Sequence, residues 1–197
     1  MKGAVPNVYG LILAGGESTR MGTDKGKIRY HTMMQREHLF ETASPCCETV
    51  FYSVREEQLE TFAVKNEVLV DQNRYSGPYN GMLTAHDHFP EVAWLVLACD
   101  LPFLNTEVLM ELVKQRNISK DITALSVKNS GEPEPLAAIW EPWALSASKT
   151  YLERGNKPSP KAFLTNCKVE LVEVSSNNYL FNANTLEDQL VAKRKLT

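Results

Sequence analysis

Residues 8–29, VYGLILAGGESTRMGTDKGKIR, decide the fold. They open with the apolar run Val8–Leu13, whose continuous branched and aromatic character is typical of a strand buried on both faces. The run stops at Gly15 and Gly16, where adjacent glycines let the backbone turn sharply and approach a ligand closely. Four cations follow: Arg20, Lys25, Lys27 and Arg29. Backbone N–H groups and mobile cations after a parallel strand predict a polyphosphate-binding turn.

A second interpretation of this stretch is an ordinary strand-to-helix turn with a solvated basic flank. On the glycines alone that interpretation is the better one. The sequence contains neither Gly-x-x-x-x-Gly-Lys-[Ser/Thr] nor Gly-x-Gly-x-x-Gly, the two best-known phosphate-binding patterns. A nucleotide would therefore be held in another way.

The composition narrows the class of protein. The 197 residues fit one domain with a substantial core. The net charge of −3 gives no general attraction to nucleic acid or to an anionic membrane, so an anionic substrate needs a local basic patch, which residues 20–29 supply. The four cysteines form no Cys-x-x-Cys pair, and no apolar run approaches the ~18 residues of a membrane span. We expect a cytoplasmic monomer that binds neither nucleic acid nor membrane.

Strand and helix patterns alternate along the chain. Strands are expected at residues 8–13, 50–54, 68–70, 92–98, 122–127, 136–140, 169–174 and 179–181. Helices are expected at 32–43, 56–63, 81–89, 105–116, 142–153, 159–165 and 184–193. This order predicts a three-layer α/β/α sandwich with a Rossmann-like, mostly parallel sheet and a small antiparallel addition in the C-terminal half. We expect a single domain over 1–197, with a nucleotide-binding part over about 1–105 and a substrate part over about 106–197.

Polar residues gather at three predicted strand ends. Ligands of open α/β sheets bind beyond the carboxyl ends of the strands, and there the sequence places Gly15, Asp71 with the following Gly77, and Asp100. Mg²⁺ prefers one or two carboxylates and completes its shell with phosphate oxygens and water. Asp100 would otherwise be a helix N-cap, which the next residues, Leu-Pro, disfavour, and Asp71 would otherwise form a turn with Asn73. We favour the functional interpretation for both carboxylates.

The glycine stretch resembles the signature of a known family. The pattern is Leu13-Ala14-Gly15-Gly16-x-Ser18-x-Arg20-Met21-Gly22-x-Asp24-Lys25. It resembles the nucleotidyltransferases that act on molybdenum cofactor, and among these the molybdenum cofactor guanylyltransferases. Further segments resemble the family in the same order: Gly77-Pro78-x-x-Gly81-Met82, Ala98-Cys99-Asp100-x-Pro102-Phe103, Glu134-Pro135-Leu136-Ala137-Ala138-Ile139-Trp140 and Phe181-Asn182-x-Asn184-Thr185-x-Glu187-Asp188.

The resemblance implies a reaction and a set of site residues. The reaction is Mg²⁺-dependent transfer of GMP from GTP to the terminal phosphate of a molybdopterin-type cofactor, which yields the guanine dinucleotide and pyrophosphate. Other proteins of molybdenum cofactor biosynthesis, or acceptor proteins, are its implied partners. The implied catalytic residues are Arg20, Lys25 and Asp100, of which Asp100 also binds the metal. The implied nucleotide-binding residues are Leu13, Ala14, Gly15, Gly16, Lys25, Ser53, Asp71, Gly77 and Asp100. The implied pterin-substrate residues are Pro135, Asn182 and Asn184.

Two departures from the family pattern concern the base pocket. Ser53 stands where the family often has an asparagine, and Tyr79-Asn80 stands where Leu-Ala is more usual. The related cytidylyltransferases usually carry Ala-Ala-Gly where this chain has Ala-Gly-Gly, so we expect Gly15 to leave room for a guanine. The alternatives are transfer of another nucleotide, from CTP or onto a sugar phosphate, or a non-catalytic nucleotide or pterin carrier.

The histidines and a late basic loop point to no further site. His86 and His88 lie two positions apart on a predicted helix, so they are expected to point in different directions and not to form a metal pair. His31 and His38 have no matching partner in the sequence. The basic loop 154–161 could contact a second anionic substrate, but a solvated loop is the preferred interpretation.

Overall fold

The fold is built on one seven-stranded sheet. The structure is a computed structural model that describes residues 5–15, 25–62 and 67–196. The strand order is β3-β2-β1-β4-β6-β5-β7. The strands are β1 (Val8–Leu13), β2 (Thr49–Val54), β3 (Val68–Val70), β4 (Ala93–Ala98), β5 (Ile122–Ser126), β6 (Pro133–Trp140) and β7 (Val169–Glu173).

The sheet is parallel apart from one strand. β1 pairs in parallel with β2 and β4, and β2 pairs in parallel with β3. β6 is antiparallel to both of its neighbours, β4 and β5, whereas β7 is parallel to β5. Among the strands described, β6 alone is therefore reversed. The predicted mostly parallel sheet with an antiparallel addition in the C-terminal half is confirmed.

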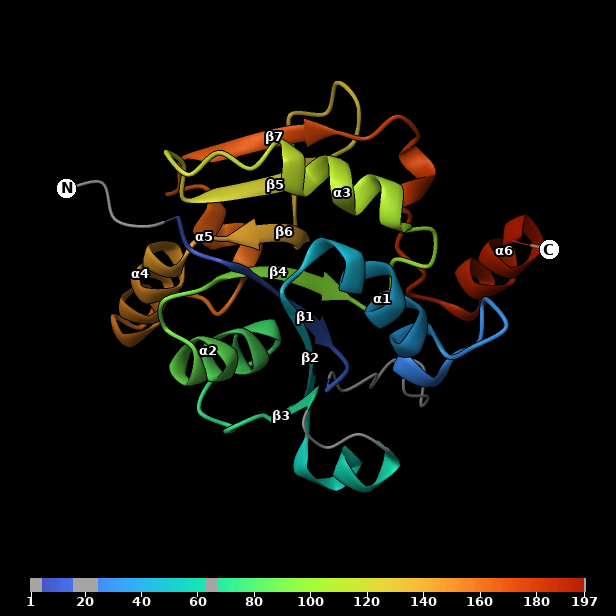
Figure 1. Cartoon of the computed structure of the whole chain (residues 1–197), viewed down its shortest axis with the longest axis horizontal. Coiled ribbons are helices and arrows are strands. Elements are labelled where there is room, and N and C mark those ends of the chain that lie inside the picture. The colour runs from blue at the N-terminus through green and yellow to red at the C-terminus, as the bar shows by residue number, and fades with distance from the viewer. Residues whose placement is uncertain (1–4, 16–24, 63–66, 197) are drawn as a thin grey trace.

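Helices cover both faces of the sheet (Figure 1). The helices α1 (Gln35–Ala43) and α3 (Thr106–Lys114) pack on one face, and α2 (Pro78–His88), α4 (Pro142–Glu153) and α5 (Pro160–Leu164) pack on the other. Successive strand residues point to opposite faces, so Ile12 enters the core under α1 and α3, and Leu11 enters the core under α2 and α4. Both residues are fully buried. This arrangement confirms the three-layer sandwich.

A third, smaller core holds the C-terminal segment against the rest of the fold. Helix α6 (Leu186–Leu196) contributes Ala192, which packs with Ile28, Tyr30 and Ala183. The Ala183 backbone N–H also donates to the Asp100 carbonyl over 2.8 Å. The chain therefore returns to the carboxyl end of β4 after completing β7, and α6, at the edge of the molecule in Figure 1, packs against the segment that precedes α1.

Several element predictions differ from the structure. The helix expected at 32–43 starts at Gln35, the helix expected at 81–89 starts at Pro78, and the strand expected at 136–140 starts at Pro133. Residues 179–181 are not a strand, because a 3-10 helix covers Asn177–Leu180 and begins where the Ser176 hydroxyl accepts from the Asn178 N–H. Residues Glu56–Thr61 form a 3-10 helix rather than an α-helix. Helix α6 starts at Leu186 and not at residue 184, because the Asp188 carboxylate accepts from the backbone N–H groups before it and caps that end.

Candidate functional site

A pocket of about 510 Å³ opens at the carboxyl edge of the parallel strands. Its walls come from the ends of β1, β2 and β4, the loop after β3 and the first turn of α2. The described lining residues are Leu13, Ala14, Gly15, Lys25, Gly26, Ser53, Arg55, Asp71, Asn73, Tyr75, Gly77, Pro78, Asn80, Gly81, Ala98, Cys99, Asp100 and Leu136. The pocket lies where the strand-end rule predicts a ligand.

A buried hydrogen bond between Ser53 and Asp71 forms part of the pocket wall. The Ser53 hydroxyl donates to Asp71 Oδ1 over 2.7 Å, and both residues are buried. Burial raises the pKa of Asp71 to about 6, although the Ser53 hydrogen bond and the charge of Arg55 act in the opposite direction. The Ser53 hydroxyl proton is thus engaged by Asp71, and the predicted contact of Ser53 with a nucleotide stays a prediction in which the hydroxyl oxygen would be the accepting atom.

The side chains of Ser53 and Asp71 occupy the space that a Cβ would need at Gly81 and Gly15. A Cβ on Gly15 would lie 2.7 Å from Asp71 Oδ2, and a Cβ on Gly81 would overlap the Ser53 hydroxyl. Gly15 therefore makes room for the Asp71 carboxylate. This differs from the expected reason for the glycine, which was space for the edge of a base.

A positive charge and a negative charge meet at the other end of the pocket. Lys25, in the 3-10 turn Lys25–Lys27, places its Nζ 3.4 Å from Asp100 Oδ2 and 2.6 Å from Asn184 Oδ1. About a quarter of the Lys25 side chain and a fifth of the Asp100 side chain are exposed, so both groups can reach a ligand in the pocket. A lysine beside a carboxylate at a strand end suits a phosphate that arrives with a divalent cation.

Polar and aromatic side chains line the β3 side of the pocket. The loop between β3 and α2 contributes Asn73, Tyr75 and Gly77. Asn73 has a φ of 55°, and its side-chain oxygen accepts from Asn80 Nδ2 over 3.1 Å. Gly77, with a φ of 64°, adopts the left-handed conformation that glycine tolerates and leads directly into α2. This end therefore offers polar and aromatic contacts to a ligand, next to the ionisable side chains of Arg55 and Asp71.

The three residues predicted to face a pterin lie beside the pocket and not among its described lining residues. Asn184 is connected to the pocket indirectly, because its side-chain oxygen accepts from the pocket residue Lys25. Asn182 donates to the Leu180 carbonyl over 3.3 Å. The Pro135 carbonyl accepts from Trp140 Nε1 over 3.0 Å, which fixes the start of β6. All three residues lie near the carboxyl end of β4, since Ala137 of β6 pairs with Leu97 and the N–H of Ala183 donates to the Asp100 carbonyl.

Glu134 is a half-buried carboxyl that the sequence analysis did not select as a site residue. Burial raises its pKa, and the nearby Asp100 adds to the rise, whereas hydrogen bonds from the Leu136 N–H and the Asn182 side chain lower it. Glu134 is therefore hydrogen-bonded to Asn182 and lies close enough to Asp100 for the two carboxylate charges to repel each other. The signal in the sequence was a glutamate set between two prolines at the start of a strand.

The pocket gathers most of the predicted nucleotide-binding residues. Leu13, Ala14, Gly15, Lys25, Ser53, Asp71, Gly77 and Asp100 all line it. Gly16 and Arg20 lie outside the described residues. The sequence analysis missed Arg55, Tyr75 and Leu136, and treated Asn80 only as a departure from the family pattern. Arg55 follows the end of β2, so the strand-end rule would have found it.

The donor set at Asp100 fits a magnesium ion that binds together with a nucleotide. Within residues 5–15, 25–62 and 67–196, no three His, Cys, Asp or Glu side chains are grouped to hold a metal by themselves. Mg²⁺ does not require such a group, because one or two carboxylates and the phosphates of a substrate suffice. Asp100 supplies one carboxylate at the charged end of the pocket.

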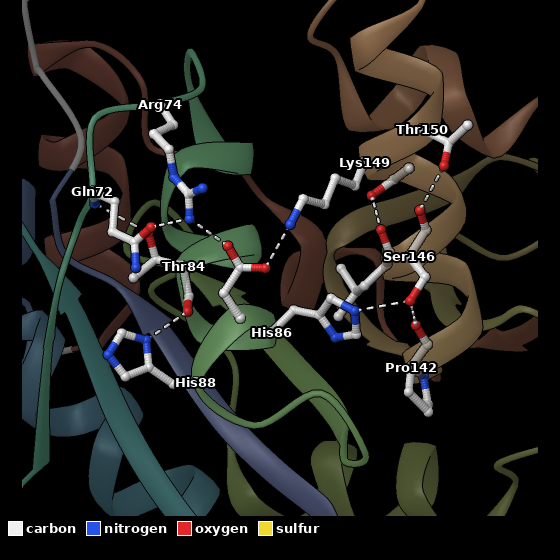
Figure 2. A network of polar contacts seen from close by, with 12 residues as sticks. Gln72, Arg74, Thr84, His86, His88, Pro142, Ser146, Lys149 and Thr150 are labelled. Carbon is white, nitrogen blue, oxygen red and sulfur yellow. Dashed lines mark hydrogen bonds and ion pairs between the residues drawn. The ribbon is translucent and has the colours of Figure 1, made fainter.

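The histidines match one expectation and contradict another. His86 Nε2 is hydrogen-bonded to the Ser146 hydroxyl of α4 and His88 Nδ1 to the Thr84 carbonyl, so the two rings point in different directions, as expected (Figure 2). His31 and His38, which lacked a partner in the sequence, stack on each other with ring centroids 3.7 Å apart. Their Nε2 atoms bond to the Pro102 and Leu104 carbonyls, so the stack supports the loop after Asp100.

Two surface observations complete the description. In the basic loop 154–161, Lys161 bonds to Glu132 over 2.8 Å, in keeping with a solvated loop. In the part of the chain that the structure describes, no helix combines the length and the apolar character needed to cross a membrane.

The sheet is mostly parallel, and its carboxyl edge carries a glycine turn and a lysine. These features place the chain among the α/β proteins that bind nucleotides at this edge. Comparison with known families makes the assignment specific. The chain belongs to the MobA-like NTP transferase family, whose domain model matches residues 10–168. It is accordingly a nucleotidyltransferase.

Individual relatives agree with this family. The Molybdenum cofactor guanylyltransferase of Shewanella halifaxensis is 26% identical, and the match covers 92% of each chain. The Molybdenum cofactor biosynthesis bifunctional protein of Synechocystis is 33% identical over 92% of this chain, which spans about half (52%) of that longer protein. The crystal structure of Molybdopterin-guanine dinucleotide biosynthesis protein A from Archaeoglobus fulgidus matches with a TM-score of 0.77 and 25% identity over 95% of this chain and 97% of that one.

Proposed function

We propose that this chain transfers GMP from GTP to the terminal phosphate of a molybdopterin-type cofactor and releases pyrophosphate. The carrying observation is the pocket, in which the Gly15 turn, Lys25 and Asp100 stand together at the carboxyl edge of the sheet. Full-length relatives named as molybdenum cofactor guanylyltransferases support the choice of substrates.

The order of the strands supports one proposed direction for the nucleotide in the pocket. Lys25 and Asp100 lie at the β1–β4 end, and Asn73, Tyr75 and Gly77 lie at the β3 end. We place the triphosphate at the first end, where the lysine neutralises its charge, and the nucleoside at the second. The Gly15 backbone lies between them, and Leu13 and Ala14 complete the floor.

The proposed reaction is an in-line substitution at the α-phosphorus of GTP. An oxygen of the pterin phosphate forms a bond to that phosphorus, and the bond from it to the β-phosphate bridging oxygen breaks, with the electron pair leaving on pyrophosphate. A phosphate nucleophile is already ionised, so positioning and charge neutralisation carry the catalysis. Lys25 and, from the glycine stretch, Arg20 would supply positive charge.

Asp100 is the proposed magnesium ligand. When bound, Mg²⁺ would stabilise the negative charge that develops on the leaving pyrophosphate. Lys25 would supply positive charge to the phosphates beside the carboxylate that holds the metal. Asn184, which accepts from the ammonium group, would keep that charge near the reacting atoms.

The pterin substrate is proposed to approach from the side of β6 and α6. Pro135, Asn182 and Asn184 lie on that side of the pocket, next to Asp100. We propose one domain over residues 1–197, in which a nucleotide-binding part (1–105) and a substrate part (106–197) share a single sheet. We further propose that it acts as a monomer in the cytoplasm, in keeping with its four free cysteines, and that it exchanges cofactor with other proteins of that biosynthesis.

The test is transfer of label from [α-³²P]GTP to purified molybdopterin-type cofactor with and without Mg²⁺. The expected product is labelled guanine dinucleotide, formed only with metal. Competition between equal GTP and CTP, read as the ratio of the two dinucleotides, tests the base. An excess of cytosine product would overturn the guanine assignment, and absence of any dinucleotide with either base would overturn the transfer reaction.

A further inference from the structure

A side-chain network outside the pocket ties its β3 end to helix α4. The loop at residues 72–77 carries Asn73, Tyr75 and Gly77 into the pocket wall. Gln72 fixes the start of this loop, because its backbone N–H donates to the Thr84 hydroxyl of α2 over 3.1 Å (Figure 2). The residue next to Asn73 toward the C-terminus is Arg74, whose guanidinium also contacts the Gln72 side chain.

Asp87 is the centre of this network. Its Oδ2 accepts from Arg74 over 2.6 Å, and its Oδ1 accepts from Lys149 over 2.9 Å. The three residues come from three elements: the pocket loop, α2 and α4. One carboxylate therefore holds two cations that would repel each other without it. The Asp87 side chain is only 21% exposed, so its ion pairs are less screened than those of a fully solvated carboxylate.

Helix α4 gives the network a fixed support. His86, next to Asp87 on α2, is hydrogen-bonded through Nε2 to the Ser146 hydroxyl over 2.9 Å, and that hydroxyl donates to the Pro142 carbonyl over 3.1 Å (Figure 2). Apolar residues of α2 and α4 share the core on this face of the sheet, among them Leu83 and Leu145. Asp87 therefore connects the loop to a packed pair of helices.

We propose that Asp87 is a positioning residue for the nucleoside end of the pocket. Its hydrogen bond to Arg74 holds the 72–77 loop in place. Its hydrogen bond to Lys149 connects that loop to helix α4. The inference rests on the proposed function, since it assigns this end of the pocket to the nucleoside of GTP. Asp87 itself does not line the pocket, so its effect passes through the loop.

The first arm of the test measures the loop without any nucleotide. Hydrogen exchange of residues 72–77 is compared among wild type, Asp87→Asn and Asp87→Glu. Asp87→Asn should speed exchange in this loop, and Asp87→Glu, which keeps the charge, should leave it near wild type. Unchanged exchange in Asp87→Asn would overturn the proposal whatever GTP does.

The second arm measures GTP binding by equilibrium dialysis. Asp87→Asn should weaken binding about fivefold, equal to roughly 1 kcal/mol, and Asp87→Glu should restore it to within about twofold. Glu111→Gln is the matched control, because Glu111 on α3 also accepts from two side chains, Lys114 and Gln115, but lies away from the pocket. Equal GTP binding by wild type and Asp87→Asn would overturn the inference. If the wild type binds no GTP, the proposed function is overturned instead. The hydrogen-exchange measurement then decides whether Asp87 positions the loop.

Discussion

The ammonium group of Lys25 lies 2.6 Å from Asn184 Oδ1, and this contact joins positions 159 residues apart. The same ammonium group lies 3.4 Å from Asp100 Oδ2. One side chain from the start of the chain therefore connects the end of β4 to the segment before α6. The charged end of the pocket depends on the C-terminal segment being docked in place.

Replacing Lys25 should affect ligand binding far more than stability. Lys25→Ala is expected to weaken GTP binding and transfer together, because the proposed phosphate charge loses its partner. The melting temperature should change little, since an exposed ion pair contributes only about 0–1 kcal/mol. Lys27→Ala, in the same turn but outside the described pocket lining, is the control. A Lys25→Ala protein that no longer folds would instead make Lys25 a structural residue.

Replacing Asp100 should remove metal-dependent transfer. Asp100→Ala is expected to fold and to lose roughly a thousandfold in transfer rate, since losing several kcal/mol of metal stabilisation costs a decade per ~1.4 kcal/mol. Single-turnover rates over a range of Mg²⁺ concentrations provide the measurement. A rate within about threefold of wild type would exclude Asp100 from the mechanism.

Asp71 should make stability depend on pH. Its folded pKa of about 6 exceeds the ordinary value of 3.8, so the folded protein holds this proton more tightly than the unfolded chain. The resulting stabilisation is complete below pH ~4 and is lost as the pH rises through about 6. Ionised Asp71 therefore costs roughly 2–3 kcal/mol at pH 7.

Asp71→Asn tests this, because an amide oxygen can still accept from the Ser53 hydroxyl. The variant should be more stable than wild type at pH 7 and should lose that advantage near pH 4, while GTP binding weakens. Urea unfolding at several pH values gives the comparison. A variant that is less stable than wild type at pH 7 would contradict the assignment.

The buried ion pair between Arg116 and Glu141 should be important for folding. Two hydrogen bonds of 2.7 Å join the guanidinium to the carboxylate, and a third of 2.7 Å reaches the Pro6 carbonyl. The side chains are 9% and 1% exposed, so Glu141→Ala leaves a buried charge without its counter-ion. We expect a loss of about 3–5 kcal/mol in the free energy of unfolding. The double variant Arg116→Met with Glu141→Leu should recover part of it, and a single-variant loss below about 1 kcal/mol would contradict this role.

The parts of the site that follow from strand ends could be predicted from sequence. Buried parallel strands have a distinct apolar pattern, and their carboxyl ends share one edge, so Gly15, Asp71 and Asp100 could be brought together without coordinates. The stack of His31 on His38 could not, because it depends on how the segment before α1 folds back. The engagement of Ser53 with Asp71 likewise depends on the spacing of neighbouring strands.

Contacts between distant segments were the least predictable. In the sequence, Asp87 is one charged residue among others on a predicted helix. Only the packing of α4 against α2 places Lys149 beside it. The strand expected at residues 179–181 failed for a local reason, since serine and asparagine side chains before it favour a capped turn over a strand. The tendency of these polar side chains to cap a turn outweighed the strand tendency of Tyr179 and Phe181.

Because β6 runs opposite to its neighbours, the connection between β5 and β6 can change in evolution without changing the parallel strands. Because β5 ends and β6 begins at the sheet edge that carries the pocket, the short connection at residues 127–132 is a hairpin tip at that same edge. A hairpin tip can lengthen or change composition without altering the pairing of the strands that it joins. Acceptor preference can therefore diversify within this architecture while the phosphate-handling strands stay as they are.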